Sequence, residues 1–174
     1  MDDFSEILEK ATKRVSPPFF LLPISGGLSV QRERVYCYEL YHQLRIIWTS
    51  SDYFLNGELD KGGHPKLKTT LGALKPDFLV HQPGSMDHNY AVMEVKPATP
   101  SIKAIRKDLK SISQLMRYAN YERGLYLIYG SVSSALASRI ADVAKADIPK
   151  AKIELWFHTS PGSSAERVAM LQTK

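Results

Sequence analysis

Residues 90–130 have the pattern of a strand, a helix and a second strand in succession. The run over 90–96 alternates and ends at a proline-rich turn, after which Ser101 is a candidate N-cap for a helix. Gly124 ends that helix, and the run over 125–130 is uniformly apolar, which is typical of a central strand. Two strands joined through a helix predict a right-handed parallel crossover, and hence an α/β sheet.

The helix of this unit carries a regular apolar stripe. Its apolar residues recur at steps of three and four, which is the spacing of one face of an α-helix. They are Ile102, Ile105, Leu109, Ile112, Met116 and Ala119. The stripe predicts that this face packs on the sheet.

The rest of the sequence predicts one domain over residues 1–174, with an αβββαβ core at about 30–130 and a central mixed sheet flanked by helices. An N-terminal helix and a C-terminal helix-strand extension complete it. The apolar connector from Ser16 is expected to dock on the core, and the last residues give no strong signal. The expected elements are helices over 2–15, 30–48, 101–123 and 131–146, and strands over 53–60, 76–81, 90–96, 125–130 and 152–158.

Composition excludes several classes of protein. The chain is 44% hydrophobic and 24% charged, as in ordinary globular domains. Asp2 and Asp3 leave no positive segment for a signal peptide, and the apolar runs are too short to span a bilayer. A single cysteine, Cys37, forms neither an intrachain disulfide nor a cysteine-rich zinc site. We therefore expect a cytoplasmic protein with no membrane partner.

Positive charge is concentrated in one segment. The chain has a net charge of +5, and residues 101–123 hold six cations against two acids, a net charge of +4. Such a run usually forms a solvated helix face, but it also suits a polyanionic partner.

The strands over 76–81 and 90–96 carry three charges at strand positions. Alternation places Asp77 on one face of the first strand, and it places Glu94 and Lys96 together on one face of the second. Charges at buried positions are costly unless they are paired, hydrated or metal-bound. If the strands form an antiparallel hairpin, the three groups converge, either as a structural salt-bridge network or as a metal site.

Phosphodiester hydrolysis requires such a set of groups. Carboxylates hold Mg²⁺, which keeps several waters and polarises a phosphate. A nearby lysine positions or deprotonates the attacking water, or stabilises charge on the phosphate.

The sequence "PD", sixteen residues and then "EVK" resembles the motif of the PD-(D/E)XK nuclease superfamily, which has the restriction-endonuclease-like fold. The resemblance implies catalytic and metal-binding roles for Asp77 and Glu94, and a catalytic role for Lys96. Many members also carry a glutamate on the helix before the first strand. Glu39 is the candidate here for a catalytic and metal-binding role, because Glu33 lies nearer the start of the helix and is less suited to reach the sheet.

The same resemblance implies a nucleic-acid-binding surface on the helix after the lysine. Some branches of the superfamily carry a Gln and a Tyr there, which are Gln114 and Tyr118 in this chain. The residues expected to hold phosphates on either side of the cleavage point are Lys103, Arg106, Lys107 and Lys110.

The expected function is a Mg²⁺-dependent nuclease acting on DNA, with Mn²⁺ as a substitute and RNA still open. Restriction, phage defence and DNA repair all suit such an enzyme, as a homodimer or as a subunit of a larger complex. One alternative is an inactive nuclease-like fold that binds nucleic acid or protein. An unrelated α/β enzyme is a further alternative, although the sequence has no P-loop and no Ser or Cys nucleophile motif.

Overall fold

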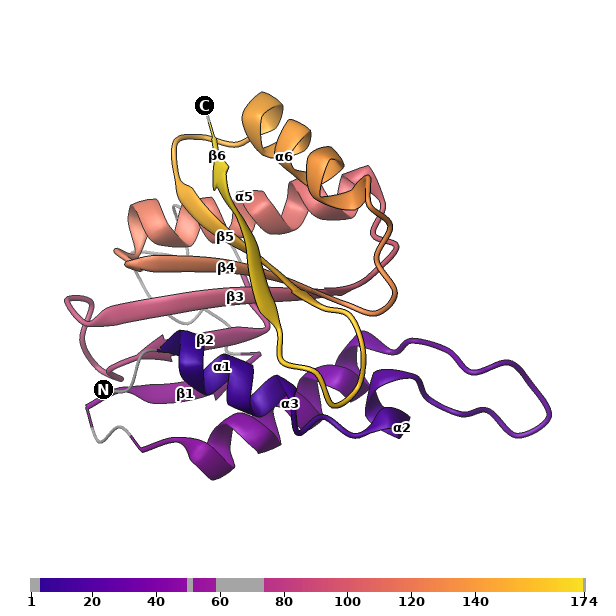
Figure 1. Ribbon diagram of the computed structural model, residues 1–174. Coiled ribbons are helices and arrows are strands. Elements are labelled where there is room, and N and C mark those ends of the chain that lie inside the picture. Colours follow the sequence, from indigo (N-terminus) through magenta and orange to yellow (C-terminus); the bar gives the residue numbers. More distant parts are fainter. Residues whose placement is uncertain (1–3, 50–51, 59–73, 174) are drawn as a thin grey trace.

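The computed structural model describes residues 4–49, 52–58 and 74–173, which form a six-stranded sheet with helices on both faces (Figure 1). The helices are α1 (Phe4–Thr12), α2 (Pro17–Phe20), α3 (Glu33–Ile47), α5 (Ile102–Tyr118) and α6 (Leu136–Asp147). The strands are β1 (Phe54–Gly57), β2 (Phe78–His81), β3 (Asn89–Pro97), β4 (Arg123–Tyr129), β5 (Lys152–His158) and β6 (Glu166–Gln172).

The sheet is mixed, as the sequence predicts. Its strands follow one another in chain order from β1 to β6, and β1, β2 and β3 pair antiparallel. Strands β3, β4 and β5 are parallel, and β6 returns antiparallel to β5. The expected hairpin of β2 and β3 is confirmed, with Phe78 opposite Met93, and so is the parallel pairing of β3 with β4 through α5.

Strand alternation divides the core into two layers. Met93 and Val95 of β3 pack with α1 and α3 on one face of the sheet, whereas Val92 packs with α5 and α6 on the other (Figure 1). The apolar stripe of α5 faces the sheet as expected, and Ile105 is fully buried. Its first member, Ile102, is half exposed because it is the first residue of the helix.

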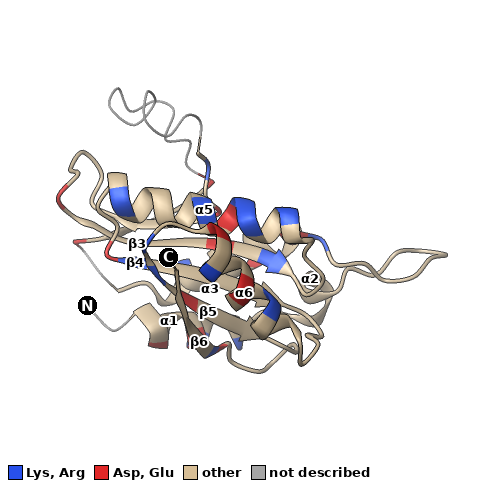
Figure 2. Ribbon diagram, turned by 90° about the horizontal axis from the view of Figure 1, so that it is seen from above, with Lys and Arg blue, Asp and Glu red and all other residues tan. Residues whose placement is uncertain are grey.

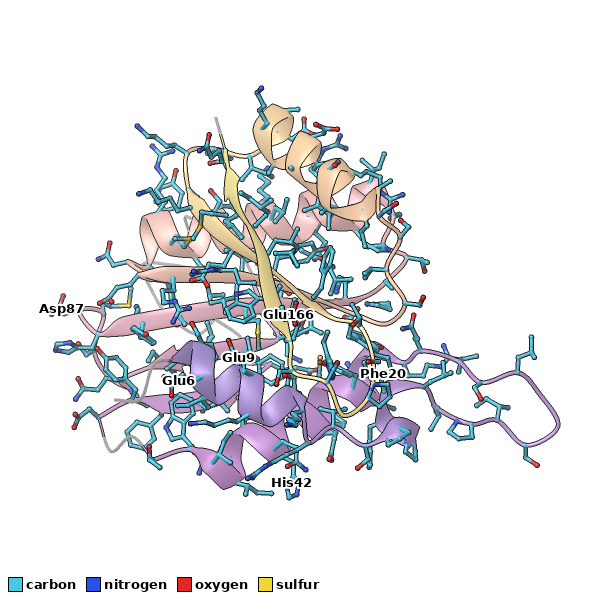
Figure 3. The ribbon with its side chains drawn as sticks, in the orientation of Figure 1. Glu6, Glu9, Phe20, His42, Asp87 and Glu166 are labelled. Carbon is cyan, nitrogen blue, oxygen red and sulfur yellow. The ribbon has the colours of Figure 1, made fainter. Side chains whose placement is uncertain are left out.

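The connector after α1 departs from the expected loop. It forms the short helix α2, and Phe20 of this helix packs edge-on against Tyr36, Tyr129 and His158 (Figure 3). The expected docking on the core is therefore confirmed for Phe20. Beyond it, a bridge between Leu22 and Val30 closes a projecting arm.

The end of the chain forms a strand that the sequence does not indicate. Strand β6 is an edge strand in which only Leu171 is fully buried, so it lacks a clear alternation of apolar and polar residues. Strand β1 ends at Gly57, before the expected end at residue 60, and Glu58 lies in a bend. Residues 59 and 60 of the predicted strand, and the turn at 61–66, lie outside the described residues. None of the helices within the described ranges is long and apolar enough to cross a bilayer.

Gly124 sets how closely α5 approaches the sheet. A Cβ at this position would lie 2.4 Å from Cγ2 of Ile112 and 2.6 Å from Sδ of Met116. We expect Gly124→Ala to lower the free energy of unfolding by about 1–3 kcal/mol, because the Ile112 and Met116 side chains must repack or move with their helix. The control is Gly57→Ala, whose Cβ would meet ordinary contacts of 3.5 Å or more. Chemical denaturation measures both, and an equal loss in the two variants would contradict the close approach.

Candidate functional site

A cavity of about 530 Å³ opens where β3 ends, between the first turn of α3 and the middle of α5. Charged side chains dominate its lining. The acids are Glu33, Glu58, Asp77, Glu94 and Asp108. The cations are Arg34, Lys75, Lys96, Lys107 and Lys110.

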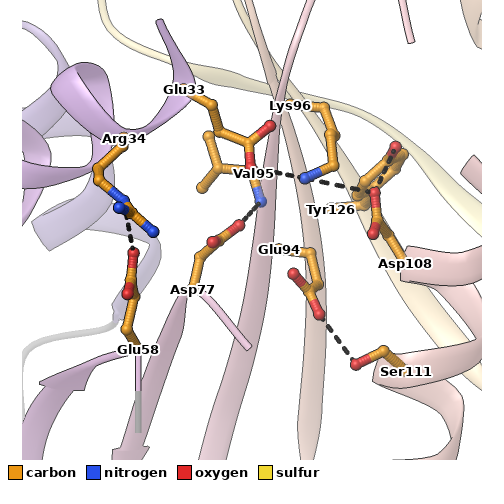
Figure 4. Close-up of polar contacts among 10 residues, drawn as sticks. All are labelled: Glu33, Arg34, Glu58, Asp77, Glu94, Val95, Lys96, Asp108, Ser111 and Tyr126. Carbon is orange, nitrogen blue, oxygen red and sulfur yellow. Dashed lines mark hydrogen bonds and ion pairs between the residues drawn. The ribbon is translucent and has the colours of Figure 1, made fainter. Parts of the chain in front are cut away.

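Asp77 and Glu94 meet in this cavity from neighbouring strands (Figure 4). Asp77 directly precedes β2, and its Oδ2 accepts the backbone N–H of Val95 at 2.7 Å. Glu94 lies within β3 and is 7% exposed, and its Oε1 accepts the hydroxyl of Ser111 from α5 at 2.9 Å. Each carboxylate therefore accepts from a neutral donor, and a side-chain hydrogen bond also links Asp77 with Glu94.

The two carboxylates repel one another. Burial raises the pKa of Asp77, although the Val95 N–H and the Lys96 charge oppose the rise. Burial also raises the pKa of Glu94 well above its usual value, and the nearby charges of Asp77 and Asp108 raise it further. A cation between them would relieve this repulsion.

Lys96 is paired with two other carboxylates. Its Nζ lies 2.8 Å from Oε1 of Glu33 and 3.7 Å from Oδ2 of Asp108. The hydroxyl of Tyr126 donates to the same Oδ2 of Asp108 at 3.4 Å. Asp108 is almost fully buried, and this burial is the main reason why its pKa rises to about 6.

The lysine is an ammonium in this arrangement. Burial lowers the pKa of Lys96, but Asp108, Glu33 and Asp77 more than offset that effect, so its pKa lies above the ordinary value. In this state Lys96 suits the stabilisation of negative charge, not the removal of a proton from water.

The structure brings Glu33 to the cavity and leaves Glu39 outside its lining. Residue 39 is two positions beyond Cys37, which lines the cavity, so the helix turns it by about 200° to the opposite side. There Glu39 accepts a hydrogen bond from Nε2 of Gln43 at 2.8 Å. The expectation that Glu33 would fall short of the sheet is wrong, and Glu39 has no place in this cavity.

Helix α5 places part of its predicted nucleic-acid-binding surface at the cavity. Lys107, Lys110 and Gln114 line the cavity. Lys103 is exposed one turn before them on the same side of α5, along which blue cationic positions are visible in Figure 2.

Two members of the predicted binding surface lie elsewhere. Arg106 pairs with Asp147 of α6 at 2.8 Å. Tyr118 is half exposed, and the guanidinium of Arg117 lies over its ring, 5.3 Å from the centre of that ring. Neither residue belongs to the cavity lining.

The salt-bridge alternative explains only one of the three charges. Lys96 is salt-bridged, but its partners are Glu33 and Asp108, neither of which that alternative invoked. Within residues 4–49, 52–58 and 74–173, neither Asp77 nor Glu94 has a cationic side chain within 4.0 Å. Within the part of the chain that the structure describes, a salt-bridge network therefore includes neither carboxylate, and only the longer-range charge of Lys96 acts on them.

Sequence reasoning missed several polar contributors to the site, among them Glu33, Asp108, Ser111 and Tyr126. A signal for Asp108 exists in the sequence, because it stands three residues after Ile105 and one before Leu109, within the buried stripe of the helix. An acid at such a position indicates a buried polar contact.

Few candidate metal ligands lie together among the described residues. Among the residues that the structure describes, no group of three or more His, Cys, Asp or Glu side chains is placed to hold a metal ion. Asp77 and Glu94 form a pair only. Asp60 and His64 lie outside the described ranges.

No protein-family model matches the sequence. No curated protein matches it either.

The repulsion between Asp77 and Glu94 predicts a pH-dependent gain in stability for Asp77→Asn. An acid whose pKa is raised by folding stabilises the folded protein fully at pH values below its ordinary pKa, which is 3.8 for Asp. This stabilisation is lost as pH rises through the pKa that the acid has in the folded protein. At neutral pH in EDTA, we expect Asp77→Asn to raise the melting temperature by roughly 2–4 °C, the shift that about 1 kcal/mol gives at this chain length. The gain should vanish in acid.

The control for this experiment is Asp87→Asn, which makes the same change at an exposed loop position (Figure 3). Thermal unfolding of the three proteins from acid to neutral pH measures the effect. Strong destabilisation of Asp77→Asn at every pH would show instead that its carboxylate is needed to hold the Val95 N–H.

Proposed function

We propose that this protein is a Mg²⁺-dependent nuclease of the PD-(D/E)XK type, with a restriction-endonuclease-like core, that hydrolyses phosphodiester bonds in DNA. The observation that carries the proposal is the repelling pair of buried carboxylates, Asp77 and Glu94, in an open cavity beside the ammonium of Lys96. The order α3-β1-β2-β3-α5-β4 supports the core assignment, because the first half of the motif directly precedes β2 and the second half lies in the adjacent strand β3.

Asp77 and Glu94 fit a magnesium ion. Mg²⁺ is usually held by one or two carboxylates and keeps waters and substrate phosphate oxygens in its remaining positions. Two carboxylates with raised pKa values in a cavity open to solvent meet this requirement without a third protein ligand. When bound, the ion polarises the phosphate and lowers the pKa of a bound water.

Lys96 stabilises negative charge on the reacting phosphate. Its ammonium lies in the same cavity and is held on the buried side by Asp108, which Tyr126 in turn positions. Because this positive charge is in place before the substrate binds, little reorganisation is needed when negative charge develops on the phosphate.

Lys107 and Lys110 bind flanking phosphates at the cavity, and exposed Lys103 extends this surface along α5. Gln114 faces the same space. Arg106 is engaged by Asp147 and contributes less. The partner is DNA, with RNA as the second possibility, and two copies would cut both strands of a duplex.

A second candidate function is a nuclease-like fold that binds nucleic acid without cutting it. The favouring observation is that Lys96 is already held by two carboxylates, while the described ranges contain no three-ligand metal group. The two functions differ in their response to Mg²⁺.

The first test is the effect of Mg²⁺ on stability and cleavage. At a concentration of about 100 times its Kd, Mg²⁺ should stabilise the wild type by about 2.7 kcal/mol. Asp77→Asn and Glu94→Gln should lose this gain, because each removes a ligand. Both variants should also lose DNA cleavage by more than the roughly 10–100-fold that loss of a supporting residue costs.

Glu39→Gln is the matched control, since it removes one carboxylate from α3 outside the cavity. It should keep the Mg²⁺ response of the wild type. If Mg²⁺ changes neither the melting temperature nor the DNA in any of the four proteins, the nuclease proposal is wrong.

The second test concerns the basic helix. Replacing Lys103, Lys107 and Lys110 with Ala should make the log–log salt dependence of DNA binding shallower by about two to three units, because three phosphate contacts are lost. All three side chains lie off the apolar stripe, so the melting temperature should change little.

The control for the basic helix removes the same amount of charge from a different region. It replaces three exposed lysines near the end of α6 and the start of β5, Lys145, Lys150 and Lys152. Anisotropy titrations at several salt concentrations compare the two triple variants. Equal slopes of the salt dependence would show that this side of α5 is an ordinary solvated helix face.

A further inference from the structure

The two carboxylates that hold Lys96 differ in how firmly they are fixed. The Asp108 side chain is only 3% exposed, and it also accepts the Tyr126 hydroxyl. The Glu33 side chain is 35% exposed, and Lys96 is the partner shown for its carboxylate, at 2.8 Å. Glu33 therefore returns to water at a small cost, whereas Asp108 cannot leave without exposing a buried charge and an unpaired hydroxyl.

Charge balance in the cavity sets a condition for any anionic ligand. The carboxylates of Asp108, Glu33 and Asp77 all act on the charge of the Lys96 ammonium. A phosphate that entered without displacing a carboxylate would add to the repulsion between like charges. A phosphate that replaces one carboxylate keeps the balance, and a phosphate oxygen accepts from an ammonium as a carboxylate oxygen does.

We propose that Glu33 is an exchangeable carboxylate: it occupies the Lys96 ammonium in the free protein, and a phosphate group of the nucleic acid displaces it on binding. Asp108 and Tyr126 keep Lys96 in position during the exchange. The proposal rests on the proposed nuclease function in one respect, because that function identifies the phosphate as part of DNA.

The exchange would make Glu33 an internal competitor of the substrate. This role of Glu33 differs from the metal-binding role that the family resemblance suggests for a glutamate on this helix. A competitor weakens phosphate binding even without metal, whereas a ligand strengthens metal binding. These opposite signs allow one set of variants to separate the two roles.

The test measures binding of a short fluorescein-labelled DNA duplex by anisotropy in EDTA. Glu33→Gln keeps the size of the side chain and removes its charge, so it should bind roughly three- to tenfold more tightly than the wild type. Glu33→Asp keeps the charge but is one methylene shorter, so it should give a smaller gain. Inorganic phosphate should compete for the same site more strongly in Glu33→Gln than in the wild type.

Glu39→Gln is the control for net charge, because it makes the same change on the opposite side of α3. It should bind close to the wild type. In a Lys96→Met background, Glu33→Gln should give no further gain, because the ammonium for which the two anions compete is gone. Melting curves establish that each variant is folded.

The results separate this proposal from the nuclease function. If Glu33→Gln binds no better than Glu39→Gln, or if the gain persists without Lys96, the exchange is wrong even where the wild type cuts DNA. If Glu33→Gln instead loses Mg²⁺ affinity with no gain in anion affinity, Glu33 is a metal ligand. If the gain appears as expected but no variant cuts DNA with Mg²⁺, the exchange holds and the protein is a binding module.

Discussion

Strand β3 buries both of its faces, and the geometry of the cavity depends on this constraint. Met93 and Val95 fill the core under α1 and α3, while Val92 fills the core under α5 and α6. A slip of one residue would exchange the faces and carry Glu94 and Lys96 into the apolar core under α1 and α3, so the register is strongly fixed. The same register directs Glu94 and Lys96 toward α5. The apolar core thus fixes the direction of two charged groups that are unfavourable in themselves.

The cavity holds like charges at close range. Asp77, Glu94 and Asp108 all have pKa values raised mainly by burial, and Lys96 is the ammonium between them. A protein selected only for stability would replace such a set with apolar residues. Raised carboxyl pKa values in an open cavity are instead typical of sites that bind a cation or handle protons. This argument favours a functional site independently of the motif.

The parts of the fold that could be predicted are those with a clear period. The stripe of α5 and the alternation in β2 and β3 give the α/β class, the hairpin and the convergence of Asp77 with Glu94. Strand β6 could not be predicted, because a single fully buried residue leaves almost no alternation.

The polar partners of the site were harder to predict. The choice of Glu39 over Glu33 failed because it needs the rotation of α3 about its axis, which the packing of Tyr36, Leu40 and Leu44 determines. Asp108 was counted as one acid within a basic surface, although it lies on the buried side of the helix. Local patterns indicate which helix reaches a site, whereas tertiary packing decides which of its side chains does so.

The approach of α5 to the sheet connects the fold with the chemistry. Gly124 pairs with Val92 across the parallel ladder, and its missing side chain leaves room for Ile112 above it. Ser111 immediately precedes Ile112 in the helix, and its hydroxyl reaches Glu94 at 2.9 Å. One turn earlier, Asp108 reaches Lys96. A larger residue at position 124 would press on the Ile112 and Met116 side chains, which neighbour these contacts on the helix. A glycine in the sheet therefore determines how firmly the ionisable groups of the cavity are held.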